Sequence, residues 1–157
     1  MQRKSNIWGP VVIGAGVITG IVLLMRKGMK TEKLSKNFDW SEFQSNDGAA
    51  MPDHVKANIK KLVPQLEKIR AAAGNRSMRI NSGYRSPAKN VAVGGAKNSY
   101  HMKGMAADFT IQGMKPNEVQ QLVGSLIDSG QITQGGLGSY GAFTHYDIRG
   151  TKSRWNG

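Results

Sequence analysis

The chain has 157 residues, of which 39% are hydrophobic, so it has the size of one domain with its core rather than two. It contains no cysteine, which excludes a disulfide framework and thiolate metal ligands. The formal net charge of +12 is spread along the chain without an arginine-rich stripe interleaved with aromatics, so we expect no specific nucleic-acid partner. A basic surface also suits an anionic cell wall or membrane.

The N-terminal residues 5–25 carry no charged side chain, and from Val11 onward they are almost wholly apolar. A helix of that length spans about 30 Å, which matches the hydrocarbon core of a bilayer. Trp8 lies at one end, and Arg26 begins a basic cluster at the other. We therefore predict a membrane anchor over residues 1–26 and a basic linker over 27–36. A cleaved signal peptide is the competing interpretation, although the stretch is long for one.

The predicted anchor places the protein in a membrane as a single-pass chain. The larger number of basic residues after the span weakly favours a cytoplasmic C-terminal domain. Gly16 and Gly20 are spaced as a small-xxx-small pair, which is able to pack one anchor helix against another.

The region after the linker begins with aromatic residues that need a surface to bury against, Phe38, Trp40 and Phe43. Apolar residues then recur at intervals of three and four from Asp53 to Gly74, which predicts one amphipathic helix. Pro64 is expected to bend that helix or divide it into two pieces.

The second half of the chain shows shorter patterns. They predict strands over 78–81 and 105–111, a helix over 116–128 with proline at its first turn, and a closing hairpin over 136–140 and 143–148. A long loop rich in glycine, serine and asparagine joins the first two strands from Ser82 to about Lys103, and loops of this length are usually functional. The predicted fold class is α+β, with a small antiparallel sheet flanked by helices over residues 37–157.

The stretch from Ser99 to Asp108 places an imidazole, His101, seven residues before a carboxylate, Asp108, with small residues between them. A second histidine, His145, lies near the C-terminus. Two histidines and one aspartate hold Zn²⁺ on three sides and leave a fourth position for water, as in a catalytic zinc site. The alternative is that these are ordinary hydrogen-bonded polar residues. The third histidine, His54, lacks acidic partners at ligand spacing and is expected on a helix surface.

Alternate residues of the predicted strand over 143–148 share a face, so His145, Asp147 and Arg149 are expected to project together. An imidazole, a carboxylate and a guanidinium side by side are not typical of a hydrophobic core. This pattern supports a functional site on one face of the sheet.

The run Ser99, His101, Gly104, Ala106 and Asp108 resembles the pattern S-x-H-x-x-G-x-A-x-D of the zinc D-Ala-D-Ala carboxypeptidases and their peptidoglycan endopeptidase relatives. That group shares its fold with lysostaphin-type peptidases and the hedgehog signalling domain. The resemblance extends from about residue 35 to the end of the chain. Further segments that resemble the family are Asn81 to Ser86, Asn90, Gly94 with Gly95, Gly138 with Tyr140, Phe143 to Asp147, and Arg154 with Trp155.

The resemblance implies one Zn²⁺ per chain, held by His101, Asp108 and His145, and a peptidoglycan peptide as substrate. It further implies that Arg85 holds the substrate and the developing oxyanion, whereas a loop-stabilising salt bridge is the structural alternative for this residue. Many members carry an acidic general base three residues before the last histidine, but this chain has Ala142 there. A branch of the family shows His-x-Asp instead, which makes Asp147 the expected general base and acid.

The sequence leaves open the role of Asp147 and the function of the domain as a whole. Asp147 is also placed to orient His145 rather than to move a proton. The domain as a whole is a membrane-anchored peptidase, either of a bacterial envelope or of the internal membrane of a phage virion. The alternatives are a degenerate metal- or wall-binding component and a basic structural protein of a virion or envelope. The sequence does not identify the bond that is cleaved, whether D-Ala-D-Ala, L-Ala-D-Glu or a diaminopimelate cross-link.

Overall fold

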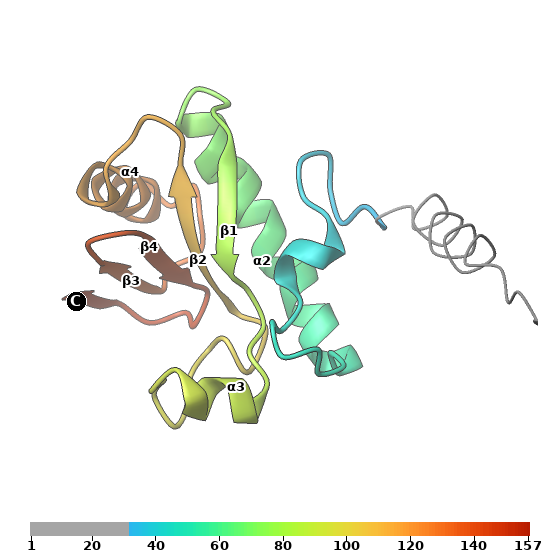
Figure 1. The fold of residues 1–157 in the computed structure, drawn as a ribbon. Helices are drawn as coiled ribbons and strands as arrows, with labels where there is room; N and C mark the ends of the chain where they lie inside the picture. The colour runs from blue at the N-terminus through green and yellow to red at the C-terminus, as the bar shows by residue number, and fades with distance from the viewer. Residues whose placement is uncertain (1–31) are drawn as a thin grey trace, which may run out of the picture. The chain divides into compact units, whose positions relative to one another are not determined.

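The computed structural model describes residues 32–157 (Figure 1). Within that range no helix is both long and apolar enough to cross a membrane. The predicted anchor over 5–25, with Gly16 and Gly20, lies outside the described residues. The elements in chain order are η1 (Trp40–Phe43), α2 (Asp53–Ala72), β1 (Met78–Ser82), α3 (Pro87–Ala92), β2 (Ala106–Ile111), α4 (Pro116–Asp128), β3 (Gly136–Ser139), β4 (Thr144–Asp147) and β5 (Ser153–Asn156).

The folded unit includes residues that the sequence assigned to the linker. Lys33 forms an isolated bridge with Asp39, and the Ser35 hydroxyl donates a hydrogen bond to Glu67 on α2 at 2.5 Å. Phe38 and Phe43 are completely buried and pack edge to face, as expected for a docked aromatic segment. Residues 33–43 therefore fasten the start of the described chain to α2.

The long helix α2 agrees with the predicted helix over 53–74, but Pro64 does not divide it. The helix is continuous from Asp53 to Ala72, with Pro64 inside. Its apolar stripe, which includes Ile59, Leu62 and Leu66, is fully buried in the core. Burial of this whole face offsets the hydrogen bond that proline removes from the helix. His54 is exposed at the start of α2, as predicted.

The sheet has five strands in the order β1-β2-β4-β3-β5 and is mixed, which corrects the prediction of an antiparallel sheet. The pairs β1–β2, β2–β4 and β3–β4 are antiparallel, whereas β5 runs parallel to β3. Both edges of β4 are already occupied, by β2 and β3. The chain that returns after β4 therefore pairs with the free outer edge of β3, and its reversed direction makes this pair parallel.

The predicted loop between the first two strands contains a short helix, α3, which the sequence analysis did not identify. The side chain of Ser86 accepts a hydrogen bond from the Lys89 backbone N–H, and Pro87 occupies the first helical turn. These are ordinary start signals for a helix. Six residues are too few to show apolar periodicity, so the pattern was not visible. In Figure 1, α3 lies beyond the end of β1, away from α4.

The two faces of the sheet differ in chemistry. Helices α2 and α4 contact each other, and both contribute buried residues to the same core as the strand residues Phe109, Leu137 and Tyr146. The alternate residues Asp108 and His145 point to the other face, as the period of two requires. The polar face of β2 and β4 is where the predicted site lies.

Candidate metal centre

The pairing of β2 with β4 places Asp108 directly opposite His145. His101 approaches from the turn that precedes β2 and is 2% exposed. Gly104 ends this turn at φ +67°, and a Cβ at that position would lie 2.6 Å from the Val55 carbonyl oxygen of α2. Glycine is therefore needed both for the backbone conformation and for the close approach to α2. This explains the glycine at the centre of the sequence motif.

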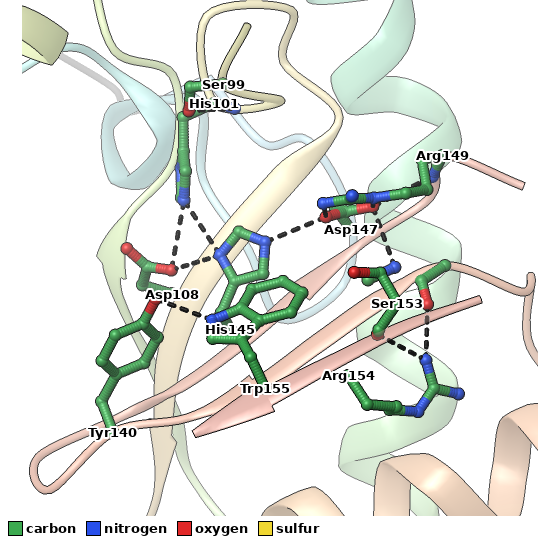
Figure 2. Close-up of polar contacts among 12 residues, drawn as sticks. Ser99, His101, Asp108, Tyr140, His145, Asp147, Arg149, Ser153, Arg154 and Trp155 are labelled. Atoms are coloured by element: carbon green, nitrogen blue, oxygen red, sulfur yellow. Dashed lines mark hydrogen bonds and ion pairs between the residues drawn. The ribbon is translucent and has the colours of Figure 1, made fainter. Parts of the chain in front are cut away.

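Three ligand atoms, one from each of these residues, converge at one point. His101 Nε2 lies 3.1 Å from Asp108 Oδ1 and 3.2 Å from His145 Nδ1, and His145 Nδ1 lies 2.8 Å from Asp108 Oδ1. Figure 2 shows the three side chains pointing toward one another. The structure thus brings together the three residues that the sequence predicted as metal ligands.

The outer contacts of both histidines determine which ring nitrogen carries the proton. His101 Nδ1 lies 2.7 Å from the Gly83 carbonyl oxygen, which only accepts, so Nδ1 carries hydrogen. His145 Nε2 lies 3.0 Å from an Asp147 carboxylate oxygen and carries hydrogen for the same reason. In the neutral rings, His101 Nε2 and His145 Nδ1 are then unprotonated and face each other. Two lone pairs and a carboxylate oxygen at hydrogen-bond distance need a shared cation between them.

The donor set fits zinc. Bonds of 2.0–2.1 Å in a tetrahedral complex place ligand atoms about 3.3 Å apart, close to the separations in this triangle. Imidazole nitrogen and carboxylate oxygen are both zinc ligands, and three protein ligands with an open fourth position are typical of catalytic rather than structural sites. All three residues line the same open cleft, so the fourth position is accessible from the cleft.

The electrostatics of the triad favour an ionised aspartate. Burial by itself would raise the pKa of Asp108, but hydrogen bonds with His101 and His145 hold it well below its usual range. Burial also lowers the pKa of His101, whereas the hydrogen bonds of His145 with Asp108 and Asp147 outweigh burial and raise its pKa. A divalent cation requires an ionised carboxylate and two neutral imidazoles, so metal binding would displace the proton that the raised pKa favours on His145.

Asp147 is fully buried and lies on the opposite side of the His145 ring from Asp108 (Figure 2). Its Oδ1 accepts from the backbone N–H groups of Gly136 and Arg149 and from Arg149 Nε, at 2.8–3.1 Å. Its Oδ2 accepts from the Arg149 guanidinium at 2.6 Å and from His145 Nε2. Burial would raise the pKa of Asp147, but these bonds hold it well below its usual value. The contacts suit a residue that orients His145.

Two glycines of β3 leave room for the groups around His145. A Cβ on Gly136 would lie 2.3 Å from Asp147 Oδ2, and one on Gly138 would lie 2.4 Å from the Trp155 indole nitrogen. The indole packs at 5.2 Å from the His145 ring, centroid to centroid, and donates a hydrogen bond to the Tyr140 hydroxyl. The position of His145 is therefore fixed from β3 and β5 as well as from β2.

Arg85 lies at the rim of the triad. Its guanidinium donates to Asp108 Oδ2 at 2.5 Å and to the Ser82 hydroxyl at 2.9 Å. The salt bridge that the sequence analysis considered as an alternative is thus present. The same side chain lines the cleft and remains partly exposed, so both predicted roles stay compatible with its position.

The cleft above the triad has a volume of about 790 Å³ and is lined by α3 and its following loop on one side and by the C-terminal strands on the other. Tyr140 and Phe143 stack at 4.6 Å along one wall. Two lining residues, Asn46 and Lys89, were not predicted from the sequence. Each is a polar residue far from the motif in sequence, so only the folded chain brings it to the site. Arg149 lines the cleft together with His145, as the alternation along the strand predicted.

Comparison with known proteins identifies the family of this domain. Residues 36–147 match the family model described as Peptidase M15. This range covers more than half of the chain and contains all of the triad.

Two curated relatives match as well. A zinc D-Ala-D-Ala carboxypeptidase of Streptomyces albus G is 39% identical over 73 residues, which cover 46% of this chain and 27% of that protein. The probable peptidoglycan L,D-endopeptidase MepK of Haemophilus influenzae is 29% identical over 185 aligned positions, which cover 99% of this chain and 96% of the relative. The chain thus matches little more than a quarter of the first relative and nearly the whole of the second.

Proposed function

We propose that this chain, which belongs to the peptidase M15 family, is a zinc metallopeptidase that hydrolyses peptide bonds of peptidoglycan. The observation that carries the proposal is the convergence of one nitrogen from each of two imidazoles and one carboxylate oxygen in an open cleft. The printed names of both relatives, a zinc carboxypeptidase and a peptidoglycan endopeptidase, agree with that chemistry.

His101, Asp108 and His145 would hold the zinc ion through Nε2, Oδ1 and Nδ1. When bound, zinc supplies a Lewis acid and makes hydroxide available near neutral pH. Asp147 holds His145 in the tautomer that keeps Nδ1 free for the metal. Gly83 does the same for His101 through its carbonyl oxygen. The ligand atoms are therefore already oriented for metal binding in the metal-free chain.

Arg85 would bind the substrate at the side of the triad where Asp108 lies. Its contacts with Asp108 and Ser82 fix the guanidinium plane while the side chain still borders the cleft. A guanidinium held in this way donates hydrogen bonds to a substrate carbonyl or carboxylate without further ordering. Arg85 thereby combines support of a metal ligand with recognition of the substrate.

A second candidate function, a domain that binds metal or wall peptide without turnover, is favoured by one observation. Asp108 is the only acidic residue that lines the cleft within residues 32–157, and Asp147, the predicted general base, has its oxygens occupied by His145, Arg149 and the Gly136 N–H. A base must reach the proton that it removes. The contacts of Asp147 favour the orienting role over the proton-transfer role.

The two candidates are separated by incubating the purified full-length chain with defined muropeptides and Zn²⁺. Mass spectrometry of the products identifies the bond that is cleaved. Loss of cleavage on chelation and its return on adding zinc would support the peptidase. Stoichiometric zinc with no product from any stem or cross-linked muropeptide would support the binding function instead.

The membrane location is a further part of this proposal and rests on the sequence of residues 5–25 alone. A small lytic domain tethered by one span would act on wall close to a membrane, as expected for a lysin of a membrane-containing phage, and Gly16 with Gly20 would pack neighbouring anchors. Carbonate extraction of membranes, with a variant that lacks residues 5–25, tests the tether. Finding the intact chain in the inner membrane of cells that carry no phage would overturn the phage assignment.

A further inference from the structure

The basic residues that line the cleft differ in whether their charge is already compensated. Arg85 is paired with Asp108 at 2.5 Å, and Arg149 is paired with Asp147 at 2.6 Å. Lys89 is the third basic residue of the lining, and no carboxylate in the described range 32–157 lies within 4 Å of its ammonium. Among residues 32–157, Lys89 is therefore the basic residue of the cleft that no carboxylate neutralises.

The position of Lys89 places this charge at one end of the cleft. It lies in the last turn of α3, and its side chain is partly buried. Together with Arg85 it also lines a smaller neighbouring cavity of about 170 Å³, so both residues stand where the two cavities meet. Asn46 and Asn81, whose side-chain amides are hydrogen-bond donors, also line both cavities. One cation with nearby amide donors is a suitable environment for a carboxylate.

Glu42 is the acidic residue of the smaller cavity, and its charge is used within the fold. Its Oε1 accepts a hydrogen bond of 2.8 Å from the Asp39 backbone N–H at the start of η1. Lys89 has no comparable structural role within the described part of the chain, because only its backbone atoms form hydrogen bonds there, with Ser86 and Val93. The side chain of Lys89 is thus available to a ligand.

We propose that Lys89 forms a subsite for a free carboxylate of the substrate, beside Arg85 at the α3 end of the cleft. This inference rests on the proposed function and specifies its substrate class: a stem peptide that keeps an ionised carboxylate, in preference to one in which that carboxylate is an amide. Lys89 sets specificity here and takes no part in bond cleavage. An ammonium binds a carboxylate by a charge-assisted hydrogen bond, which a neutral amide does not match.

The test compares two stem peptides that differ only in a free carboxylate or a carboxamide at the same residue. Binding of both is measured by calorimetry on the metal-free full-length chain, which excludes turnover, and kcat and KM are measured on the zinc-loaded chain. The variants are Lys89→Gln, Lys89→Arg and, as a matched control, Lys97→Gln. Lys97 is exposed on the loop after α3 and does not line the cleft.

Lys89→Gln is expected to weaken binding of the carboxylate peptide, and to raise its KM, by about two- to fivefold, as for a partly exposed ion pair. Its kcat and its binding of the amide peptide should stay unchanged. Lys89→Arg should keep the preference, and Lys97→Gln should match the wild type. Equal effects of Lys89→Gln on both peptides, or no effect on either, would overturn the subsite. Absence of hydrolysis by the wild type would instead contradict the proposed function, while the calorimetry would still decide the subsite.

Discussion

The two faces of the β2–β4 pair are built from alternating residues of the same strands and follow opposite rules. On one face, Phe109 and Tyr146 are completely buried in the apolar core beneath α2 and α4. On the other, Asp108 and His145 are nearly as buried, at 4% and 8% exposure, yet they are polar and connected to each other. Burial alone therefore does not separate the stabilising face from the functional one.

The difference lies in how each buried group is compensated. The apolar face gains free energy in proportion to the area that it removes from water. The polar face must instead satisfy every donor and acceptor. Gly83 and Asp147 accept hydrogen bonds from the outer nitrogens of His101 and His145, and a metal ion shared by the inner nitrogens and Asp108 would complete the network. Burying such a network costs desolvation free energy, and the completed network favours one arrangement of its side chains. We expect mutations on the two faces to separate stability from chemistry.

The largest effect is expected on the polar face. His101→Ala removes one of three metal ligands and should reduce hydrolysis by about a thousandfold or more, equivalent to ~4 kcal/mol of barrier. Zinc content after dialysis and muropeptide turnover measure it. His101→Gln is the companion variant that keeps a polar side chain at this buried position. Bound zinc and turnover in both folded variants would contradict the assigned ligand.

On the apolar face, Phe109→Ala should lower the free energy of unfolding by about 3–5 kcal/mol, because it leaves a cavity in the core. Urea denaturation with the metal removed measures the loss. Thr110→Ala, the next residue along β2 and only partly buried, is the matched control and should cost less than about 1 kcal/mol. Zinc per folded molecule should stay at one in both variants, and its loss in Phe109→Ala would show that the two faces are not separable.

Asp147→Asn tests how far the polar network extends beyond the ligands. It should weaken zinc binding by about 10- to 100-fold, because the amide orients His145 less firmly than the carboxylate. Hydrolysis should return at saturating zinc. Unchanged zinc affinity together with lost hydrolysis at saturating zinc would instead support the general-base role that the sequence predicted. Asp53→Asn, at an exposed position on α2, is the control for removing one negative charge.

The smallest effect concerns pH. The folded-state pKa values of Asp108 and Asp147 both lie well below the unfolded value. Near pH 4 the unfolded chain takes up protons that the folded chain does not, so the stability of the metal-free protein should fall as the pH drops below about 5. Chemical denaturation at successive pH values measures this slope. Asp147→Asn should flatten it, and an unchanged acid slope would mean that the carboxylate is not compensated as the contacts indicate.

Much of the fold follows from local patterns. The bounds of α4 agree with its prediction, β2 differs by one residue, and α2 begins where its apolar stripe begins. The helix α3 and the strand β5 were not predicted. The six residues of α3 are too few to show helical periodicity, and β5 contains a single apolar residue, Trp155. The parallel pairing of β5 with β3 depends on which sheet edge is free, and no residue pattern records that.

The sequence by itself determined the residue types and the spacing of a zinc site, His101, Asp108 and His145, because a metal demands particular donor atoms whatever surrounds them. Only the tertiary structure decided which tautomer each histidine adopts and which residues contact the ligands. The Gly83 carbonyl selects the His101 tautomer, and the distant strands β3 and β5 leave space for Asp147 and Trp155. Lys89 comes to the cleft through a helix that was not predicted. Such contacts depend on distances between segments far apart in the chain, and a linear pattern does not carry them.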